Sequence, residues 1–138
     1  GGFAYSVGMP PDIAASVQKA LELMHREPER VAQLQQNGAY FLEYAKSKRL
    51  DTGFGRGTSV TPIVVGDSLG AVILSQELNH RGINVQPVIY PAVPPKSARL
   101  RFFITSNHST QDIETAIDTM VDEIARLPER MQAMKTMA

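Results

Sequence analysis

Apolar residues recur at helical spacing through most of the first fifty residues. The first repeat consists of Ile13, Val17, Ala20, Leu21 and Met24. These positions share one face of a helix, which is expected to run from Asp12 to about Arg26. Pro28 is typical of the first position of a helix, because that position needs no backbone N–H donor. The apolar stripe of this second expected helix consists of Val31, Leu34, Gly38, Phe41 and Ala45.

Short apolar runs separated by turn residues replace this spacing after residue 50. Residues 60–65, V-T-P-I-V-V, predict a strand, and Pro62 favours an edge position because proline cannot donate to a neighbouring strand. Asp67 lies in the turn expected to cap a helix over residues 69–81. Gly82 follows at the position where a glycine in the left-handed conformation is common. Residues 85–89 predict a second strand.

Strict alternation predicts a third strand in the stretch from residue 98 to 109, A-R-L-R-F-F-I-T-S-N-H-S. Leu100, Phe102 and Ile104 share one face, which can bury in a core. The opposite face carries Arg99, Arg101, Phe103 and Thr105. Two interpretations of this second face are open: a solvated sheet surface, or an anion site at a cleft.

The segment Ser109-Thr110-Gln111-Asp112 resembles a capping box and predicts the start of a last helix. This helix is expected to end at Pro128, followed by a polar, Met-rich tail that forms a frayed short helix. The predicted order is α-α-β-α-β-β-α. The simplest packing is an α/β fold in which a small, mainly antiparallel sheet is covered by helices on one face, with long N-terminal helices.

The length of 138 residues predicts a single domain over residues 1–138. Residues 1–11 form an irregular lead-in, residues 12–50 the two helices, and residues 60–127 a small α/β core. The chain begins G-G-F rather than with Met, so we expect it to be a fragment of a longer protein.

Charge and composition narrow the function classes. Lys and Arg total 14 and Asp and Glu total 14, a balance that argues against a nucleic-acid binder or a polybasic membrane surface. No apolar run approaches the roughly 20 residues that span a bilayer. The chain has no Cys, which removes disulfides, thiolate ligands and a Cys nucleophile and fits a cytoplasmic protein.

The chain shows no catalytic constellation of its own. His25, His80 and His108 are scattered, and no His, Asp and Glu cluster has metal-ligand spacing. The glycine-rich stretch over residues 51–59, D-T-G-F-G-R-G-T-S, lacks the lysine and the following helix of a phosphate loop. The sequence is therefore typical of a domain that adds side chains to a site completed elsewhere.

Three segments in register resemble one enzyme family. The lead-in F-A-Y-S-V-G-M-P-P resembles the F-x-[FY]-[ST]-x-x-x-P-P segment of the α-oxoamine synthases. R-G-I-N-V-Q-P-V-I-Y-P-A-V-P and A-R-L-R-F-F-I-T-S-N-H-S resemble that family's C-terminal core. The family includes aminooxononanoate synthase, aminolevulinate synthase, glycine acetyltransferase and serine palmitoyltransferase. The resemblance covers almost the whole chain.

This resemblance implies the C-terminal domain of a pyridoxal 5'-phosphate (PLP) enzyme of aminotransferase fold type I. Family members are homodimeric acyltransferases that condense an amino acid with an acyl-CoA or acyl-carrier thioester and release CO2. The lysine that binds PLP covalently lies upstream of the F-x-Y-S segment in the family, and no position here matches it. We therefore expect the isolated fragment to be inactive.

The resemblance also implies roles for particular residues. Arg101 matches the family's binder of the amino-acid carboxylate, whereas Arg99 is expected to form a structural ion pair. Ser6, Val7 and Gly8 match the segment that reaches the PLP phosphate of the partner subunit, although Val7 and Gly8 offer no side-chain donor. Ala92 matches a position on the acyl-substrate side, where some members carry Thr.

Two alternatives stay open. One is the C-terminal domain of another fold-type-I aminotransferase, which shares the carboxylate-binding arginine. The other is a non-enzymatic α/β module that binds a ligand or a partner. An RNA-binding strand of the RRM type would need a basic surface and several exposed aromatic residues, and Phe103 is one exposed aromatic in a neutral chain.

Overall fold

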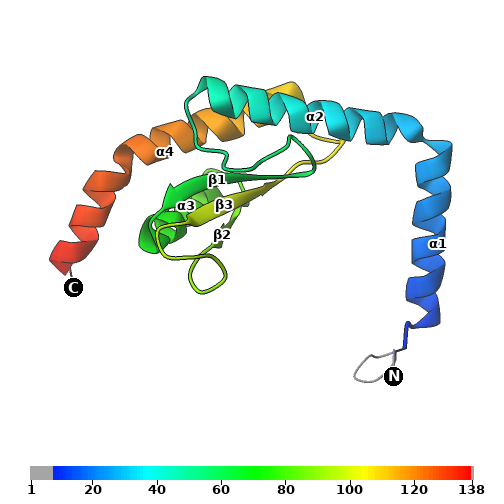
Figure 1. Cartoon of the computed structure of the whole chain (residues 1–138), viewed down its shortest axis with the longest axis horizontal. Coiled ribbons are helices and arrows are strands. Elements are labelled where there is room, and N and C mark those ends of the chain that lie inside the picture. Colours follow the sequence, from blue (N-terminus) through cyan, green and yellow to red (C-terminus); the bar gives the residue numbers. More distant parts are fainter. Residues whose placement is uncertain (1–7, 138) are drawn as a thin grey trace. The chain divides into compact units, whose positions relative to one another are not determined.

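The computed structural model describes residues 8–137, with side chains through Ala133 (Figure 1). Its elements are α1 (Pro11–Arg26), α2 (Pro28–Ser47), β1 (Val60–Gly66), α3 (Ser68–His80), β2 (Gln86–Val88), β3 (Ala98–Phe103) and α4 (Thr110–Met137). This order confirms the predicted α-α-β-α-β-β-α arrangement. The chain divides into two compact units, Gly1–Ala32 and Gln33–Ala138.

Helix α1 is the main element of the first unit. It begins at Pro11, one residue before the predicted start, with Pro10 as its N-cap, because neither position needs a hydrogen-bond donor. The helix contains no buried residue. Its apolar stripe is about half exposed and consists of Ile13, Val17, Leu21 and Met24. The backbone N–H of Glu27 donates to Leu23 and closes the last turn.

The second unit contains a three-stranded sheet of order β1-β3-β2 in which both pairs are antiparallel. The predicted small antiparallel sheet is thus confirmed, and β1 is an edge strand, as Pro62 indicates. Strand β2 spans three residues rather than the predicted 85–89. Pro87 has no N–H to donate, and the chain turns away at Tyr90–Pro91, so few residues of this segment pair with β3.

One face of the sheet packs against the helices. In β3, Ala98, Leu100 and Phe102 are buried, whereas Arg101 and Phe103 are exposed, which confirms the predicted division of faces. The core joins residues of the sheet with Phe41 of α2, residues of α3 such as Leu74, and Ile113, Ile117 and Met120 of α4. The Phe41 and Phe102 rings lie 5.2 Å apart between centroids and contribute an aromatic contact to this core.

Polar contacts join α2 to α4 above this core. The Tyr40 hydroxyl donates to Glu114, and the Tyr44 hydroxyl donates to Asp118. The hydrogen bond with the Glu114 carboxylate, which favours the protonated phenol, raises the pKa of Tyr40 to about 12. Lys48 forms an ion pair with Asp118 at 2.6 Å. The two helices therefore share a row of matched polar groups.

Helix α3 begins and ends one residue earlier than predicted, and its predicted cap at Asp67 and glycine turn at Gly82 are confirmed. The Asp67 carboxylate accepts a hydrogen bond from the Gly70 N–H at 2.7 Å and caps the helix. Gly82 follows α3 with φ +82°, the left-handed conformation that a side chain would strain. This turn sends the chain from α3 toward β2.

Helix α4 begins at the predicted capping box but does not end at Pro128. The Asp112 N–H donates to the Ser109 hydroxyl at 3.1 Å, and the Ser109 N–H donates back to the Asp112 carboxylate. Helical residues continue to Met137, so the predicted end was wrong. The axis bends between the orange and red parts of the helix (Figure 1), as expected where proline removes one backbone hydrogen bond.

The segment beyond Pro128 is held by side-chain contacts with the rest of the second unit. Arg130 forms ion pairs with Glu77 of α3 at 2.8 Å and with Glu123 of α4 at 2.7 Å. These contacts offset the loss of the backbone hydrogen bond at Pro128. Because Glu77 is far from Pro128 in sequence, the local pattern around residue 128 does not indicate them.

Candidate functional site

The open face of the sheet carries the arginine singled out from the sequence. In the register of the sheet, Arg101 lies between Pro62 of β1 and Gln86 of β2. Arg99 lies in the next row between Val64 and Val88. On this face Arg101 is exposed, and the buried residues of β3 lie on the opposite face. It therefore presents cationic groups from a rigid central strand.

The N–H donors of the Arg101 guanidinium have no acceptor among the described residues. Within residues 8–137 it forms no hydrogen bond and no ion pair, and its Cζ lies 5.0 Å from the centroid of the Phe103 ring. Arg101 and Phe103 are two residues apart on one strand, so their side chains project from the same face. The period-two pattern already indicated this shared face; the ring contact is what the structure adds.

Arg99 is used differently. It is half-buried, and its Nε–H donates to the Ser97 carbonyl at 3.0 Å. Among the described residues Arg99 forms no ion pair, so the expected pair stays a prediction. This bond to a backbone carbonyl two residues away engages one of the five N–H donors of Arg99.

The end of β3 is fixed to α2 by a buried amide that sequence analysis missed. The Asn37 Nδ2 group donates to the carbonyls of Thr105 and His108, at 2.9 and 2.8 Å. Gln33 donates to the Asn37 side-chain oxygen. Asn37 is 5% exposed; its polar side chain within an otherwise apolar stripe was the signal that could have found it.

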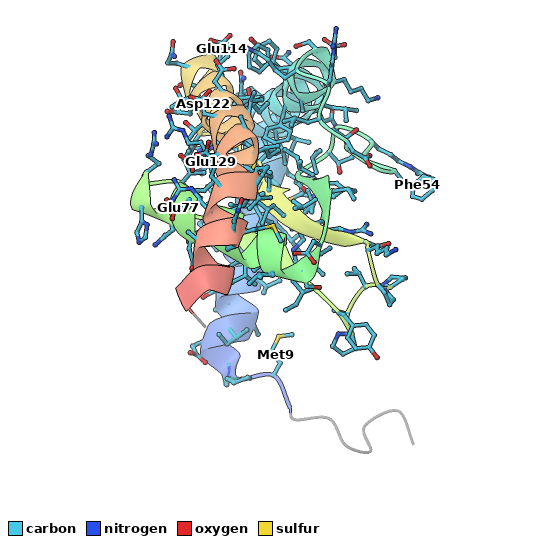
Figure 2. All side chains as sticks on the ribbon, turned by 90° about the vertical axis from the view of Figure 1, so that its left-hand side faces the viewer. Met9, Phe54, Glu77, Glu114, Asp122 and Glu129 are labelled. Carbon is cyan, nitrogen blue, oxygen red and sulfur yellow. The ribbon has the colours of Figure 1, made fainter. Side chains whose placement is uncertain are left out.

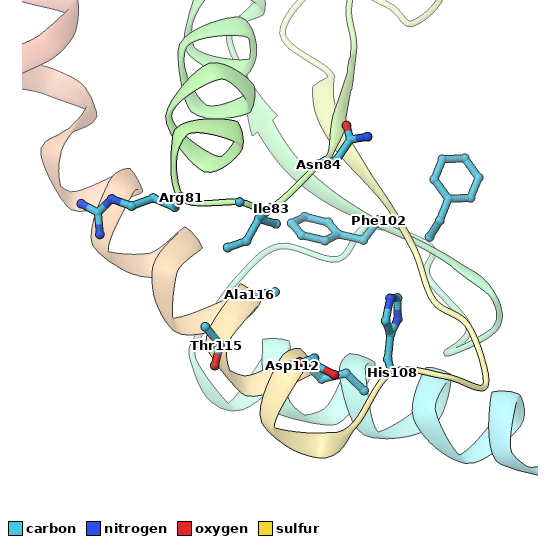
Figure 3. A pocket seen from close by; sticks show the side chains of 11 residues that line it. Arg81, Ile83, Asn84, Phe102, His108, Asp112, Thr115 and Ala116 are labelled. Atoms are coloured by element: carbon cyan, nitrogen blue, oxygen red, sulfur yellow. The ribbon is translucent and has the colours of Figure 1, made fainter.

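A cavity of about 480 Å³ lies between the turn after α3, the end of β3 and the start of α4, and both Phe102 and Phe103 line it (Figure 3). Ile83 and Phe102 lie between Arg81 on one side and His108 on the other. Its lining includes no residue expected from the sequence to bind cofactor or substrate. Sequence analysis therefore did not point to this cavity.

The polar groups of the cavity already have partners. Arg81 pairs with Glu123, and the His108 Nδ1 atom accepts from the Thr105 N–H. Hydrogen bonds from the Ser109 side chain and backbone lower the pKa of the Asp112 carboxyl. These local bonds hold the β3–α4 turn in place and leave few donors or acceptors for a ligand.

The remaining predicted site residues lie in the first unit, in the loop after β2 or outside the described part. Ser6 and Val7 lie outside the described residues. Gly8 is exposed, and a Cβ built on it meets no atom within 4 Å. Ala92 is exposed in the loop after β2. That loop leaves the sheet beyond the Val88–Arg99 pair, whereas Arg101 pairs with Gln86 at the other end of β2.

The glycine-rich loop has a packing role. A Cβ on Gly38 of α2 would lie 2.5 Å from the Gly57 carbonyl oxygen, so helix and loop approach at backbone distance. Gly57 itself has φ +68°. Phe54 at the tip of the loop is fully exposed and points away from the sheet (Figure 2). The loop's glycines are explained by close approach and turn geometry.

Neither a metal centre nor a membrane span emerges from the described residues. Among residues 8–137, no group of three His, Cys, Asp or Glu side chains is placed to hold a metal ion. Across the same residues, each helix is too short or too polar to cross a bilayer.

Comparisons with known proteins agree on one group. The aminotransferase class I and II family model matches residues 1–120. An 8-amino-7-oxononanoate synthase from Symbiobacterium thermophilum is 38% identical over 115 residues, covering 83% of this chain and 29% of that protein. The structure of 8-amino-7-oxononanoate synthase from Francisella tularensis matches with a TM-score of 0.74 at 26% identity, covering 88% of this chain and 35% of that one.

A more distant enzyme shares the fold. A serine palmitoyltransferase variant from S. paucimobilis, solved with bound PLP and myriocin, matches with a TM-score of 0.79 at 18% identity, covering 90% of this chain and 31% of that one. The described chain thus spans between 29% and 35% of the length of these three proteins.

Proposed function

The chain belongs to the aminotransferase class I and II family, and from this premise we propose that it is the C-terminal part of a PLP-dependent α-oxoamine synthase. The resemblance to that group predicted from the sequence is confirmed by relatives at 38% identity. The complete enzyme would be a biosynthetic acyltransferase that joins an amino acid to an acyl thioester with loss of CO2. By itself the 138-residue chain would be inactive.

The observation that carries this proposal is the uncommitted guanidinium of Arg101 on the open sheet face. A guanidinium stays charged at all working pH values and matches a carboxylate through two parallel N–H donors. Because Arg101 is on the central strand, its backbone is held by pairs on both sides. We assign it as the anchor of the amino-acid carboxylate. An anchored carboxylate fixes the orientation of the Cα bonds.

The described residues fit PLP only through the backbone. Gly8 has no side-chain donor, so it would offer its backbone N–H to a phosphate oxygen, and Pro10 and Pro11 contribute no N–H. Ser6 and Val7 remain proposed neighbours of the phosphate. The lysine that holds the cofactor would lie outside this chain. When bound, PLP supplies an electron sink for the carbanion formed at the amino-acid Cα.

We propose that the acyl donor is a thioester, either an acyl-CoA or an acyl-carrier thioester. Ala92, in the exposed loop after β2, would border the acyl group. Its methyl group offers no hydrogen bond, so recognition there would depend on shape. The complete enzyme would act as a cytoplasmic homodimer, since the lead-in of one subunit is proposed to reach the cofactor of the other.

Substitution of Arg101 in the full-length enzyme tests this function. Binding of glycine, L-alanine and L-serine to the purified enzyme is measured by calorimetry, and the tightest ligand is kept. Arg101→Ala should weaken its binding by about 1.5–3 kcal/mol, the scale of a hydrogen bond to a charged group. Arg101→Lys should recover part of this loss, because an ammonium cannot form the bidentate pair.

Arg99→Ala is the matched control, since it removes the same group from the same strand face. Its guanidinium is bonded to Ser97, so amino-acid affinity should stay close to that of the unsubstituted enzyme. Equal affinities for the Arg101→Ala, Arg99→Ala and unsubstituted enzymes, each folded and loaded with PLP, would overturn the assignment and return the face to a solvated surface.

A further inference from the structure

We propose that Phe103 is the positioning residue for Arg101: its ring holds the face of the guanidinium and leaves the N–H edge free for a carboxylate. The inference rests on the proposed function, because it assumes that Arg101 binds the amino-acid substrate. It adds Phe103, whose half-exposed ring also borders the cavity beside Phe102 and His108.

The backbone fixes the relation between the two side chains. Phe103 pairs with Val60 of β1, and Arg101 pairs with both neighbouring strands, so neither residue can rotate away with its backbone. The Cζ of Arg101 lies 5.0 Å from the ring centroid, within the roughly 6 Å range of a cation–π contact. Phe103 is 54% exposed and is not part of the core cluster.

The type of contact decides which donors remain. Paired arginines elsewhere in the chain, such as Arg81 and Arg130, direct their N–H groups at carboxylates. The Phe103 ring offers no oxygen acceptor, so its contact with the guanidinium leaves the five N–H donors available for a ligand. Within the described residues Arg101 has no hydrogen bond or ion pair that competes for them. The contact therefore orders the side chain without occupying its binding edge.

Ordering before binding raises affinity. An exposed arginine loses much of its rotamer freedom when a ligand immobilises it. Where the ring already restricts the guanidinium, less of that loss accompanies binding. The expected signature is a change in amino-acid affinity that depends on the presence of Arg101.

The experiment is a double-mutant cycle in the full-length enzyme, with calorimetric binding of glycine, L-alanine and L-serine. Phe103→Leu keeps an apolar side chain and removes the ring; it should raise the dissociation constant of the tightest ligand about three- to tenfold. Phe103→Tyr keeps the ring and should stay within about twofold of the unsubstituted enzyme. In the Arg101→Ala background, Phe103→Leu should have no further effect.

Other outcomes separate the two proposals. If Arg101→Ala weakens binding and Phe103→Leu does not, the positioning role is wrong and the proposed function stands. An equal effect of Phe103→Leu with and without Arg101 would mean that the ring acts through packing, which also overturns the positioning role. If Arg101→Ala leaves binding unchanged, both proposals fail. Phe103→Met provides a second ring-free variant should Phe103→Leu not fold.

Discussion

Arginine side chains serve different purposes between the helices and on the open sheet face. Between α3 and α4, Arg81 and Arg130 pair with the fully buried carboxylate of Glu123 at 2.8 and 2.7 Å, and Arg126 approaches it at 3.4 Å. On the open face, Arg101 has no carboxylate within the described residues and rests against a ring. The guanidinium thus forms structural ion pairs between the helices, whereas on the open face its N–H donors are available to a ligand.

The difference between the paired arginines and Arg101 indicates which region of the chain can bind a ligand. A buried carboxylate costs several kcal/mol to desolvate and is retained only where cations compensate it. Glu123 satisfies that requirement, and Arg130 extends the pairing to Glu77. Three arginines contact Glu123, although the buried Nε of Arg130 has no hydrogen-bond partner among the described residues. Because the carboxylates and most of the donors are paired with one another, the cluster stabilises the fold and leaves little capacity for a ligand. An arginine on a rigid strand with free donors is where a ligand can bind.

Removal of the buried carboxylate should have the largest effect. Glu123→Gln replaces the acceptor of three arginines with a neutral amide, so the free energy of unfolding should fall by about 3 kcal/mol. Urea unfolding of the full-length protein measures the change. Glu129→Gln is the matched control, because Glu129 lies on the exposed side of the same helix and should change stability by less than about 0.5 kcal/mol. Equal unfolding midpoints for the two variants would show that the cluster does not stabilise the fold.

A smaller effect is expected where α2 approaches the glycine-rich loop. A methyl group on Gly38 would lie 2.5 Å from the Gly57 oxygen and 2.8 Å from the Thr58 oxygen. Gly38→Ala gains about 1 kcal/mol of helix propensity, but the forced shift of two backbone carbonyls costs about 2–3 kcal/mol. The net loss of about 1–2 kcal/mol should appear in urea unfolding.

Gly8→Ala is the control for this packing effect, because nothing lies within 4 Å of its added methyl group. Its unfolding midpoint should match that of the unsubstituted protein. A Gly38→Ala protein that is more stable than the original would mean that the loop yields easily, and that the helix side of the sheet is less tightly packed than its burial indicates.

Much of this architecture was predictable because local rules and the global fold agree. The faces of β3, the cap at Asp67 and the capping box at Ser109 each follow from a short pattern of residues. The continuation of α4 past Pro128 does not follow from the local pattern, and the ion pair of Arg130 in this segment is with Glu77, which is remote in sequence.

The site divides in the same way. The face that carries Arg101 follows from strand periodicity, and its assigned role came from resemblance to a family. Asn37 binds two carbonyls about seventy positions away, and no local pattern contains such a partner. The ring contact of Arg101 was within reach of the sequence, because residues two apart on a strand share a face.

A loss of similar size is expected at the turn after α3. Gly82 has φ +82° with open space around it, so a substitution adds backbone strain without a clash. Gly82→Val should lower the free energy of unfolding by about 1–2 kcal/mol. Gly82→Asn should lose less, because asparagine tolerates the left-handed conformation. Urea unfolding of both variants makes the comparison, and an equal loss for Asn and Val would point to a contact rather than to backbone strain.

The smallest expected effect concerns the pKa of a single carboxyl at the start of α4. Hydrogen bonds from Ser109 lower the pKa of Asp112, so its contribution to stability is present above the unfolded pKa and is lost as the pH falls through the folded value, below about pH 4. Ser109→Ala should move the pKa of Asp112 upward, which carboxyl NMR with labelled aspartate measures. Asp118 is the internal control, because Lys48 lowers its pKa from a different element and Ser109→Ala should leave it unchanged. If the pKa of Asp112 is the same with and without the Ser109 hydroxyl, the capping box does not hold this carboxylate. The helix side of the sheet would then contain a charged group without a hydrogen-bond partner, like Arg101 on the open face.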